Sequence, residues 1–353
     1  MLTSGLFGYI TDYLFWWLLL FSLVVHTWCF FKLFPKDRPR RSGLIIGNIL
    51  VFACLAGVAM MAGETYLRFS CVETDSFGLS LPARRWFVYH TSLNSLGCRD
   101  AEWSVEKRPG VRRIAFVGDS FTYGWGIERV EHRFPDLVGS ALREKRDGEY
   151  EILNVAKPGW GTGGQIEPVR DLATRFDVDE IVFCYVANDI EKLLPQKAGF
   201  SPTRPSLPTI FDLDRSCLLE FAYWRLYVPR LAAMSGYFDW LAQGYGDEST
   251  WRAQQRLLYE IIALCQDHGV ELRVALLPFI RARGDKYDVK RIHGLLREYF
   301  EANGVAVADL QPAIENREPA ELVVSSADPH PNELAHRLFA EAIMEGFYAK
   351  AGR

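Results

Sequence analysis

The chain has 353 residues, which is enough for two average domains or for one α/β domain with additional segments. It is 49% hydrophobic and 24% charged, with a formal net charge of −4 at pH 7. No basic stripe occurs outside one short N-terminal loop, which argues against a nucleic-acid partner. The seven cysteines form no CxxC pair and there is no HExxH motif. The sequence therefore indicates neither a metal site nor a cofactor.

Two uncharged apolar stretches lie near the N-terminus, at Leu14–Phe31 and Ser42–Gly63. At 1.5 Å per residue, each is about long enough to cross a hydrocarbon core of ~30 Å. A cleaved signal peptide is the alternative for the first stretch. However, that stretch has no basic residue before it and no small-residue cleavage site after it. We expect two transmembrane helices, at about 14–34 and 42–63.

Basic residues between the two stretches set the expected orientation. They outnumber the single acidic residue there, Asp37, and are Lys32, Lys36, Arg38, Arg40 and Arg41. The positive-inside rule places this loop in the cytoplasm and both ends of the hairpin outside. We therefore expect a multi-pass protein of the cytoplasmic (inner) membrane, with the rest of the chain on the periplasmic or extracellular side.

The sequence predicts three parts. Residues 1–64 form the membrane hairpin, 65–110 an irregular stalk, and 111–353 a domain in which strands and helices alternate. Strands are expected at 113–117, 151–156, 180–186, 271–277 and 305–310, and helices at 134–145, 164–175, 251–268, 289–303 and 333–350. This order predicts an α/β fold, a three-layer sandwich around a five-stranded parallel sheet.

Cys71 and Cys98 are the candidate pair for a disulfide on the periplasmic or extracellular side, and the sequence does not decide whether they form one.

An insert at about 190–249 interrupts the alternation. Its first part is rich in proline and its second part is aromatic and helix-like. The aromatic side chains either wall a substrate cleft or pack under a long excursion of the chain, and the sequence does not decide between these roles. They are Phe200, Phe211, Phe221, Tyr223, Trp224, Tyr227, Tyr237, Phe238 and Trp240.

The first predicted strand ends at Gly118-Asp119-Ser120 and passes into a helix. A serine at such a break lies at the carboxyl edge of the sheet, where α/β proteins place reactive groups. It is then either a helix cap or a nucleophile. Three other blocks follow predicted strands toward the same edge. They are Gly159-Trp160, Asn188-Asp189 and Asp328-Pro329-His330. Together they provide amide donors and an acid–base pair, which favours the nucleophile.

In these four blocks the chain resembles the SGNH/GDSL hydrolase superfamily, over about residues 112–350. The resemblance implies a flavodoxin-like sandwich and a triad of Ser120, His330 and Asp328. It also implies an oxyanion hole from the backbone N–H groups of Ser120 and Gly159 and the amide of Asn188. Asn94, Gly97 and Arg99 resemble the lead-in segment of membrane-anchored bacterial members. The supporting residues would be Asp119 and Asp189, and the candidate substrate contacts Trp160 and Tyr123.

Two departures from the superfamily pattern are visible. Val186 stands where the third block usually begins with glycine, and the last block is Asp-x-His instead of Asp-x-x-His. Pro329 and Pro331 each favour an extended preceding residue, so Asp328 and His330 are expected to project from the same side. The shorter spacing also occurs in relatives of polysaccharide O-acetyltransferases.

The expected reaction is acyl transfer through a covalent serine ester. Water as acceptor gives an esterase acting on O-acyl, chiefly O-acetyl, esters of cell-envelope or extracellular carbohydrate or lipid. A polysaccharide hydroxyl as acceptor gives an O-acyltransferase. The third interpretation is a membrane-anchored binding or assembly protein that keeps the fold but has no catalytic activity. The partners are then the ester substrate, the membrane and unidentified membrane proteins of a polysaccharide pathway.

Overall fold

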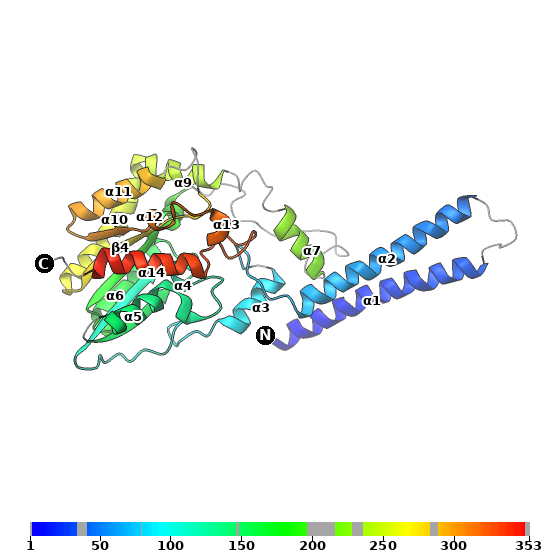
Figure 1. Ribbon diagram of the computed structural model, residues 1–353, viewed down its shortest axis with the longest axis horizontal. Helices are drawn as coiled ribbons and strands as arrows, with labels where there is room; N and C mark the ends of the chain where they lie inside the picture. Colours follow the sequence, from blue (N-terminus) through cyan, green and yellow to red (C-terminus); the bar gives the residue numbers. More distant parts are fainter. Residues whose placement is uncertain are drawn as a thin grey trace. The chain divides into compact units, whose positions relative to one another are not determined.

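The computed structural model describes residues 2–33, 41–78, 80–145, 148–195, 216–227, 236–282 and 289–349, with side chains from residue 10 onward. These residues divide into two compact units (Figure 1). The helix unit comprises the described residues within Met1–Glu73, Phe77–Arg85 and Ser201–Leu231. The sheet unit comprises Thr74–Ser76 and the described residues within Trp86–Phe200 and Ala232–Arg353. Lys36, Arg38, Arg40, Phe200 and Phe211 lie outside the described residues.

The helix unit is built on two long helices, α1 (Leu2–Leu33) and α2 (Arg41–Phe69). Apolar segments at Ile10–Leu33 and Arg41–Phe69 are long and apolar enough to cross a membrane, with mean hydropathies of 1.9 and 2.4. Large apolar side chains such as Leu18 and Phe52 are 66% and 73% exposed. Such exposure is costly in water and is typical of a surface that meets lipid or another protein.

A short helix, α7 (Cys217–Ala222), begins on a buried carboxylate of α2. Glu64 accepts hydrogen bonds from the backbone N–H groups of Cys217 (3.0 Å) and Leu218 (2.9 Å) and from the Ser216 hydroxyl (2.8 Å). These are N–H groups of the first turn, which lack partners within their own helix. This part of the insert is therefore bonded to the second apolar helix, and it continues as a π-helix, η5 (Tyr223–Tyr227).

The sheet unit contains five strands, all parallel, in the order β2-β1-β3-β4-β5. This confirms the predicted sheet. The strands are β1 (Val111–Gly118), β2 (Glu149–Ala156), β3 (Glu180–Val186), β4 (Glu271–Leu277) and β5 (Ala306–Asp309). Gly118, the last residue of β1, pairs with Ala156, the last residue of β2, and with Cys184, two residues before the end of β3.

Alternate residues of each strand enter one of two hydrophobic cores, which explains the three layers. Ala115 and Val117 face a core shared with α6 (Thr162–Arg175), α10 (Glu248–Asp267) and α11 (Val289–Ala302). Ile114 and Phe116 face the opposite core, shared with α5 (Phe134–Lys145) and α14 (Glu333–Tyr348). Figure 1 labels helices of both layers, α6, α10 and α11 of the first and α5 and α14 of the second.

Several short elements were not part of the sequence prediction. The 65–110 segment contains α3 (Leu81–His90), whose first turn donates Ala83 N–H to the Ser80 hydroxyl, at 3.3 Å. The carboxyl edge carries α4 (Ser120–Tyr123), two 3-10 helices, η1 (Val130–His132) and η2 (Ala187–Leu193), and two short helices, α12 (Gln311–Ile314) and α13 (Pro319–Leu322). In contrast, α9 (Tyr237–Gly246) overlaps the second part of the insert, which was expected to be helix-like. Cys71 and Cys98 are both free thiols, each buried in the core of its own unit.

Candidate active site

A tight turn at the end of β1 presents Ser120. A Cβ on Gly118 would lie 2.1 Å from the Thr122 hydroxyl and 3.1 Å from Cys184 Cβ, so only glycine lets the chain fold back here. Asp119 is fully buried and caps α4, its Oδ1 accepting the Phe121 N–H at 2.9 Å. Ser120 thereby begins a helix at the carboxyl edge of a central strand.

Ser120, His330 and Asp328 form one hydrogen-bonded chain. His330 Nε2 lies 3.0 Å from Ser120 Oγ, and His330 Nδ1 lies 2.6 Å from Asp328 Oδ1. The same Asp328 oxygen also accepts the backbone N–H of His330 at 3.1 Å, which is possible because only Pro329 separates the two residues. Asp328 is fully buried, and Ser120 and His330 are 8% and 9% exposed.

The ionised form of Asp328 is favoured in this arrangement. Burial raises the pKa of its carboxyl, but the positive charge of His330, its hydrogen bonds and the nearby Thr74 hydroxyl together bring the pKa below the ordinary value. With the carboxylate on Nδ1, Nε2 is the ring nitrogen that faces Ser120 Oγ.

Aromatic rings enclose the imidazole of His330. Trp125 is stacked on it, with centroids 5.0 Å apart and planes at 21°, and Phe121 meets it edge-on at 5.6 Å. Phe121 continues into a row of rings through Phe279 (5.8 Å) to Phe238 of α9 (5.4 Å). The second half of the predicted insert therefore packs on residues next to Ser120. Neither Trp125 nor Phe279 was singled out from sequence, because neither belongs to a recognisable motif.

Asn188 and Asp189 lie beside the turn that presents Ser120, and their environments differ. Asn188 is half-buried and its Nδ2 donates to Asp119 Oδ2 over 3.3 Å. Asp189 is 1% exposed and accepts from Gln165 Nε2 at 3.4 Å. Burial, and then the negative charge of Asp119, raise the pKa of Asp189 well above its ordinary value. Burial also raises the pKa of Asp119, although the Phe121 N–H, His330 and Asn188 oppose it.

The turn after β2 exposes Gly159 and Trp160. Gly159 has a φ of +74° and no atom within 4 Å of where a Cβ would stand. Only glycine adopts this conformation without strain, and its backbone is open to solvent. Trp160 is half-buried, and the Lys157 ammonium lies 5.4 Å from its ring centroid. Among the residues that the structure describes, no hydrogen bond joins Gly159 to Ser120.

Tyr123, expected as a substrate contact, and Val186, which stands where the superfamily usually has glycine, are both buried. Tyr123 is only 5% exposed and lies under the Arg99 guanidinium, 5.7 Å away, so its placement does not favour contact with a substrate. Val186 ends β3 in extended conformation (φ −114°, ψ 144°) and packs in the core. Extended backbone suits any residue, so glycine is not required there.

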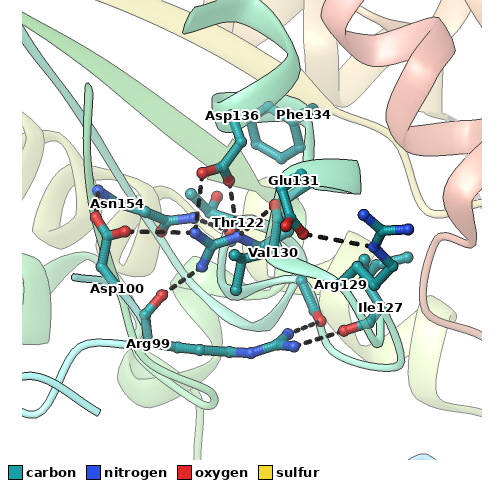
Figure 2. Close-up of polar contacts among 12 residues, drawn as sticks. Arg99, Asp100, Thr122, Ile127, Arg129, Val130, Glu131, Phe134, Asp136 and Asn154 are labelled. Carbon is teal, nitrogen blue, oxygen red and sulfur yellow. Dashed lines mark hydrogen bonds and ion pairs between the residues drawn. The ribbon is translucent and has the colours of Figure 1, made fainter. Parts of the chain in front are cut away.

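The lead-in segment holds the loop that follows α4, as Figure 2 shows. Arg99 is 1% exposed and donates to the carbonyls of Gly124 (2.8 Å) and Ile127 (2.7 Å). Burial and the neighbouring charge of Arg133 lower the pKa of Arg99 to about 10. Arg133 donates in turn to the Arg99 carbonyl and to Asp136 Oδ2 (2.8 Å).

The chain matches the model of the GDSL-like Lipase/Acylhydrolase family over residues 116–338. The match covers more than half of the chain and contains Ser120, Gly159, Asn188 and His330. The chain therefore belongs to this family, a class of hydrolases that act on esters. A search of curated proteins finds no match.

Several solved structures are similar to part of this chain. TesA is 12% identical with a TM-score of 0.43, covering 67% of this chain and 98% of its own. The psychrotrophic esterase EstA from Pseudoalteromonas sp. is 13% identical (TM-score 0.41; 67% and 96%). A catalytic mutant of Axe2, an acetylxylan esterase from Geobacillus stearothermophilus, is 14% identical (TM-score 0.39; 69% and 96%).

Proposed function

We propose that this protein is a membrane-anchored serine esterase that hydrolyses O-acyl esters, with Ser120 as nucleophile, His330 as general base and Asp328 as its orienting carboxylate. The observation that carries the proposal is the continuous chain from Ser120 Oγ through the imidazole to Asp328, with separations of 3.0 and 2.6 Å. These are the separations that proton transfer between such groups requires.

In the first half-reaction Ser120 Oγ attacks the ester carbonyl carbon while its proton passes to His330 Nε2. The carbonyl π electrons move to the oxygen, giving a tetrahedral oxyanion. On collapse, the C–O bond to the alcohol breaks and the alcohol leaves with the proton from His330. Water then attacks the acyl-enzyme by the same route, which releases the acid and restores Ser120.

The proposed oxyanion hole consists of the backbone N–H groups of Ser120 and Gly159 and the side-chain amide of Asn188. Gly159 supports this role because its backbone is exposed and carries no side chain. Asn188 supports it because its Nδ2 carries two hydrogens and donates one of them to Asp119, over 3.3 Å, which leaves the other for an oxyanion.

The proposed substrates are O-acyl, chiefly O-acetyl, esters of cell-envelope or extracellular carbohydrate or lipid. The half-buried Trp160 next to Gly159 offers an aromatic face of the kind that sugar rings stack on, and the Lys157 ammonium above it suits an anionic group. In the proposed arrangement, α1 and α2 span the cytoplasmic membrane and the sheet unit lies on the periplasmic or extracellular side.

Activity-based labelling tests the proposal. The full chain in detergent micelles is treated with a fluorophosphonate probe, and p-nitrophenyl acetate hydrolysis is measured in parallel. We expect labelling and hydrolysis in the wild type and neither in Ser120→Ala or His330→Ala. Ser95→Ala is the matched control, because Ser95 is an exposed serine bonded to Glu102. A well-folded wild type that is not labelled would instead indicate a binding or assembly protein.

Two further measurements test the acceptor and the location. Hydrolysis of acetylated xylan with and without added oligosaccharide acceptor separates the two reactions, since an acyltransferase forms a new ester with the acceptor and an esterase does not. A reporter fused after Arg353 that is active only in the cytoplasm would contradict the proposed orientation.

A further inference from the structure

Three residues downstream of α2 are built into the sheet unit. Thr74–Ser76 packs with the sheet unit, whereas the chain up to Glu73 and from Phe77 to Arg85 packs with the helix unit. Thr74 and Asp75 are 3% and 4% exposed. We call Thr74–Ser76 the buttress. Each of its residues acts on a group next to the His330 imidazole: Ser76 on Ala327, Asp75 on Trp125 and Thr74 on Asp328.

Ser76 holds the residue before the triad carboxylate. Its backbone N–H and its hydroxyl both donate to the carbonyl of Ala327, at 3.2 and 2.9 Å. Ala327 is covalently joined to Asp328, and this carbonyl cannot rotate without losing both bonds. The backbone from which the carboxylate projects is therefore fixed from outside its own loop.

Asp75 holds the ring that covers His330. Its backbone carbonyl accepts the indole N–H of Trp125 at 3.0 Å, inside the protein. Trp125 is the ring stacked on His330. This bond sets the orientation of the indole, and the indole limits how far the imidazole can tilt away from Ser120.

Thr74 lies near the triad carboxylate. The two hydrogen bonds between His330 and Asp328 both use Oδ1. Over the described part of the chain, Asp328 Oδ2 and Thr74 Oγ1 are both buried with no partner at ordinary hydrogen-bond geometry. The Thr74 hydroxyl is nevertheless close enough to be among the donors that lower the pKa of Asp328. A small approach of these two atoms would complete the bond.

We infer that the buttress is a positioning element of the active site, in which Thr74, Asp75 and Ser76 hold Asp328 and His330 in line with Ser120. They touch neither substrate nor reacting atoms, and they act through Asp328, Trp125 and Ala327. The inference rests on the proposed function, since it concerns the same triad. In this inference the segment after α2 both connects the two units and positions the triad.

The test uses the full chain in detergent micelles with p-nitrophenyl acetate as substrate. Thr74→Val removes the hydroxyl at nearly constant volume, and Thr74→Ser keeps it. We expect Thr74→Val to lower kcat about 10-fold with KM changed by less than about 2-fold, and Thr74→Ser to retain most of the activity. In Thr74→Val the acid limb of the kcat/KM profile moves to higher pH, because Asp328 loses a donor that stabilises its ionised form.

Ser76→Ala removes one of the two bonds to Ala327, and we expect kcat to fall about 3-fold. Thr174→Val is the matched control, since the Thr174 hydroxyl bonds a carbonyl of α6 on the exposed surface, and its kcat stays at the wild-type value. Thermal unfolding of each variant separates lost activity from lost fold.

Wild-type kcat and an unshifted pH profile in both Thr74→Val and Ser76→Ala would overturn the inference, while loss of activity in Ser120→Ala would leave the proposed function standing. Undiminished activity in Ser120→Ala would instead overturn the proposed function itself. If Thr74→Val does not fold, the test rests on Ser76→Ala. A kcat of Ser76→Ala equal to that of the control Thr174→Val would then overturn the inference.

Discussion

The indole of Trp125 lies flat against the imidazole of His330, with ring centroids 5.0 Å apart and planes at 21°. In the proposed reaction His330 becomes an imidazolium when it takes the proton of Ser120. The face of an aromatic ring attracts a cation, and this attraction is present in the transition state but weak for the neutral imidazole. Stacking of this kind stabilises the transition state selectively.

Replacing Trp125 should therefore lower kcat. We expect Trp125→Leu to reduce it by about 3- to 30-fold, which corresponds to about 0.5–2 kcal/mol for a cation on an aromatic face. Trp125→Phe keeps a face but loses the bond to the Asp75 carbonyl, so its loss should be smaller. Steady-state kinetics checks both variants. Trp251→Leu is the control, because Trp251 of α10 packs against Tyr245 of α9 and Tyr299 of α11 and makes no contact with His330. Equal kcat in Trp125→Leu and wild type would contradict the role.

Asn188→Ala should lower kcat by about 10²–10³-fold, the usual effect of removing one oxyanion donor. The fold should persist, because the amide makes only a 3.3 Å bond to Asp119. The measurement is kcat and KM together with the unfolding midpoint. Asn303→Ala, which removes an amide bonded to the Tyr299 carbonyl at the end of α11, should keep wild-type kcat. An active Asn188→Ala protein would remove this side chain from the hole.

The stability of Asp189→Asn relative to the wild type should increase as the pH rises. Burial and the charge of Asp119 raise the pKa of Asp189 well above its ordinary value. Between about pH 4 and the raised pKa, the unfolded chain releases a proton that the folded protein keeps, so the free energy of unfolding of the wild type falls with pH. This loss is about 1.4 kcal/mol per pH unit within that window, and the asparagine variant does not incur it.

Denaturant unfolding of Asp189→Asn and wild type at pH 4.5 and pH 8 measures this difference. Exposed Asp171 on α6 supplies the control, since Asp171→Asn should show no comparable change between the two pH values. A stability difference for Asp189→Asn that is the same at both pH values would show that this carboxyl is ionised in the folded protein.

Arg99→Lys should destabilise the sheet unit by about 2–4 kcal/mol, because one ammonium cannot reach the separate carbonyls of His90, Gly124 and Ile127. The loop after α4 would loosen, and kcat should fall with it. Arg252→Lys changes an exposed pair with Glu248 and should alter stability by less than about 0.5 kcal/mol. Thermal unfolding and kinetics of the two variants make the comparison. Similar unfolding midpoints for both would argue against the role of Arg99.

Local sequence determined the order of the strands and helices in the sheet unit and the turn at Ser120. Buried strands such as Glu180–Val186 are apolar runs, and Gly118 marks the only residue type that the turn accepts, so both are readable without the fold. The four-block pattern also indicated the family, which residues 116–338 confirm. Two apolar N-terminal helices follow from composition alone.

Packing between distant segments decided the rest. Tyr123 follows Ser120 by three residues, yet Arg99 covers it, and α3 forms where the sequence suggested an irregular stalk. The stacking of Trp125 on His330 and the bonds of Thr74–Ser76 join parts of the chain far apart in sequence, and none of them has a periodic or motif signature. Such contacts arise only when the sheet brings strand ends together. Sequence therefore identified which residues could react, and tertiary structure decided which residues hold them in line.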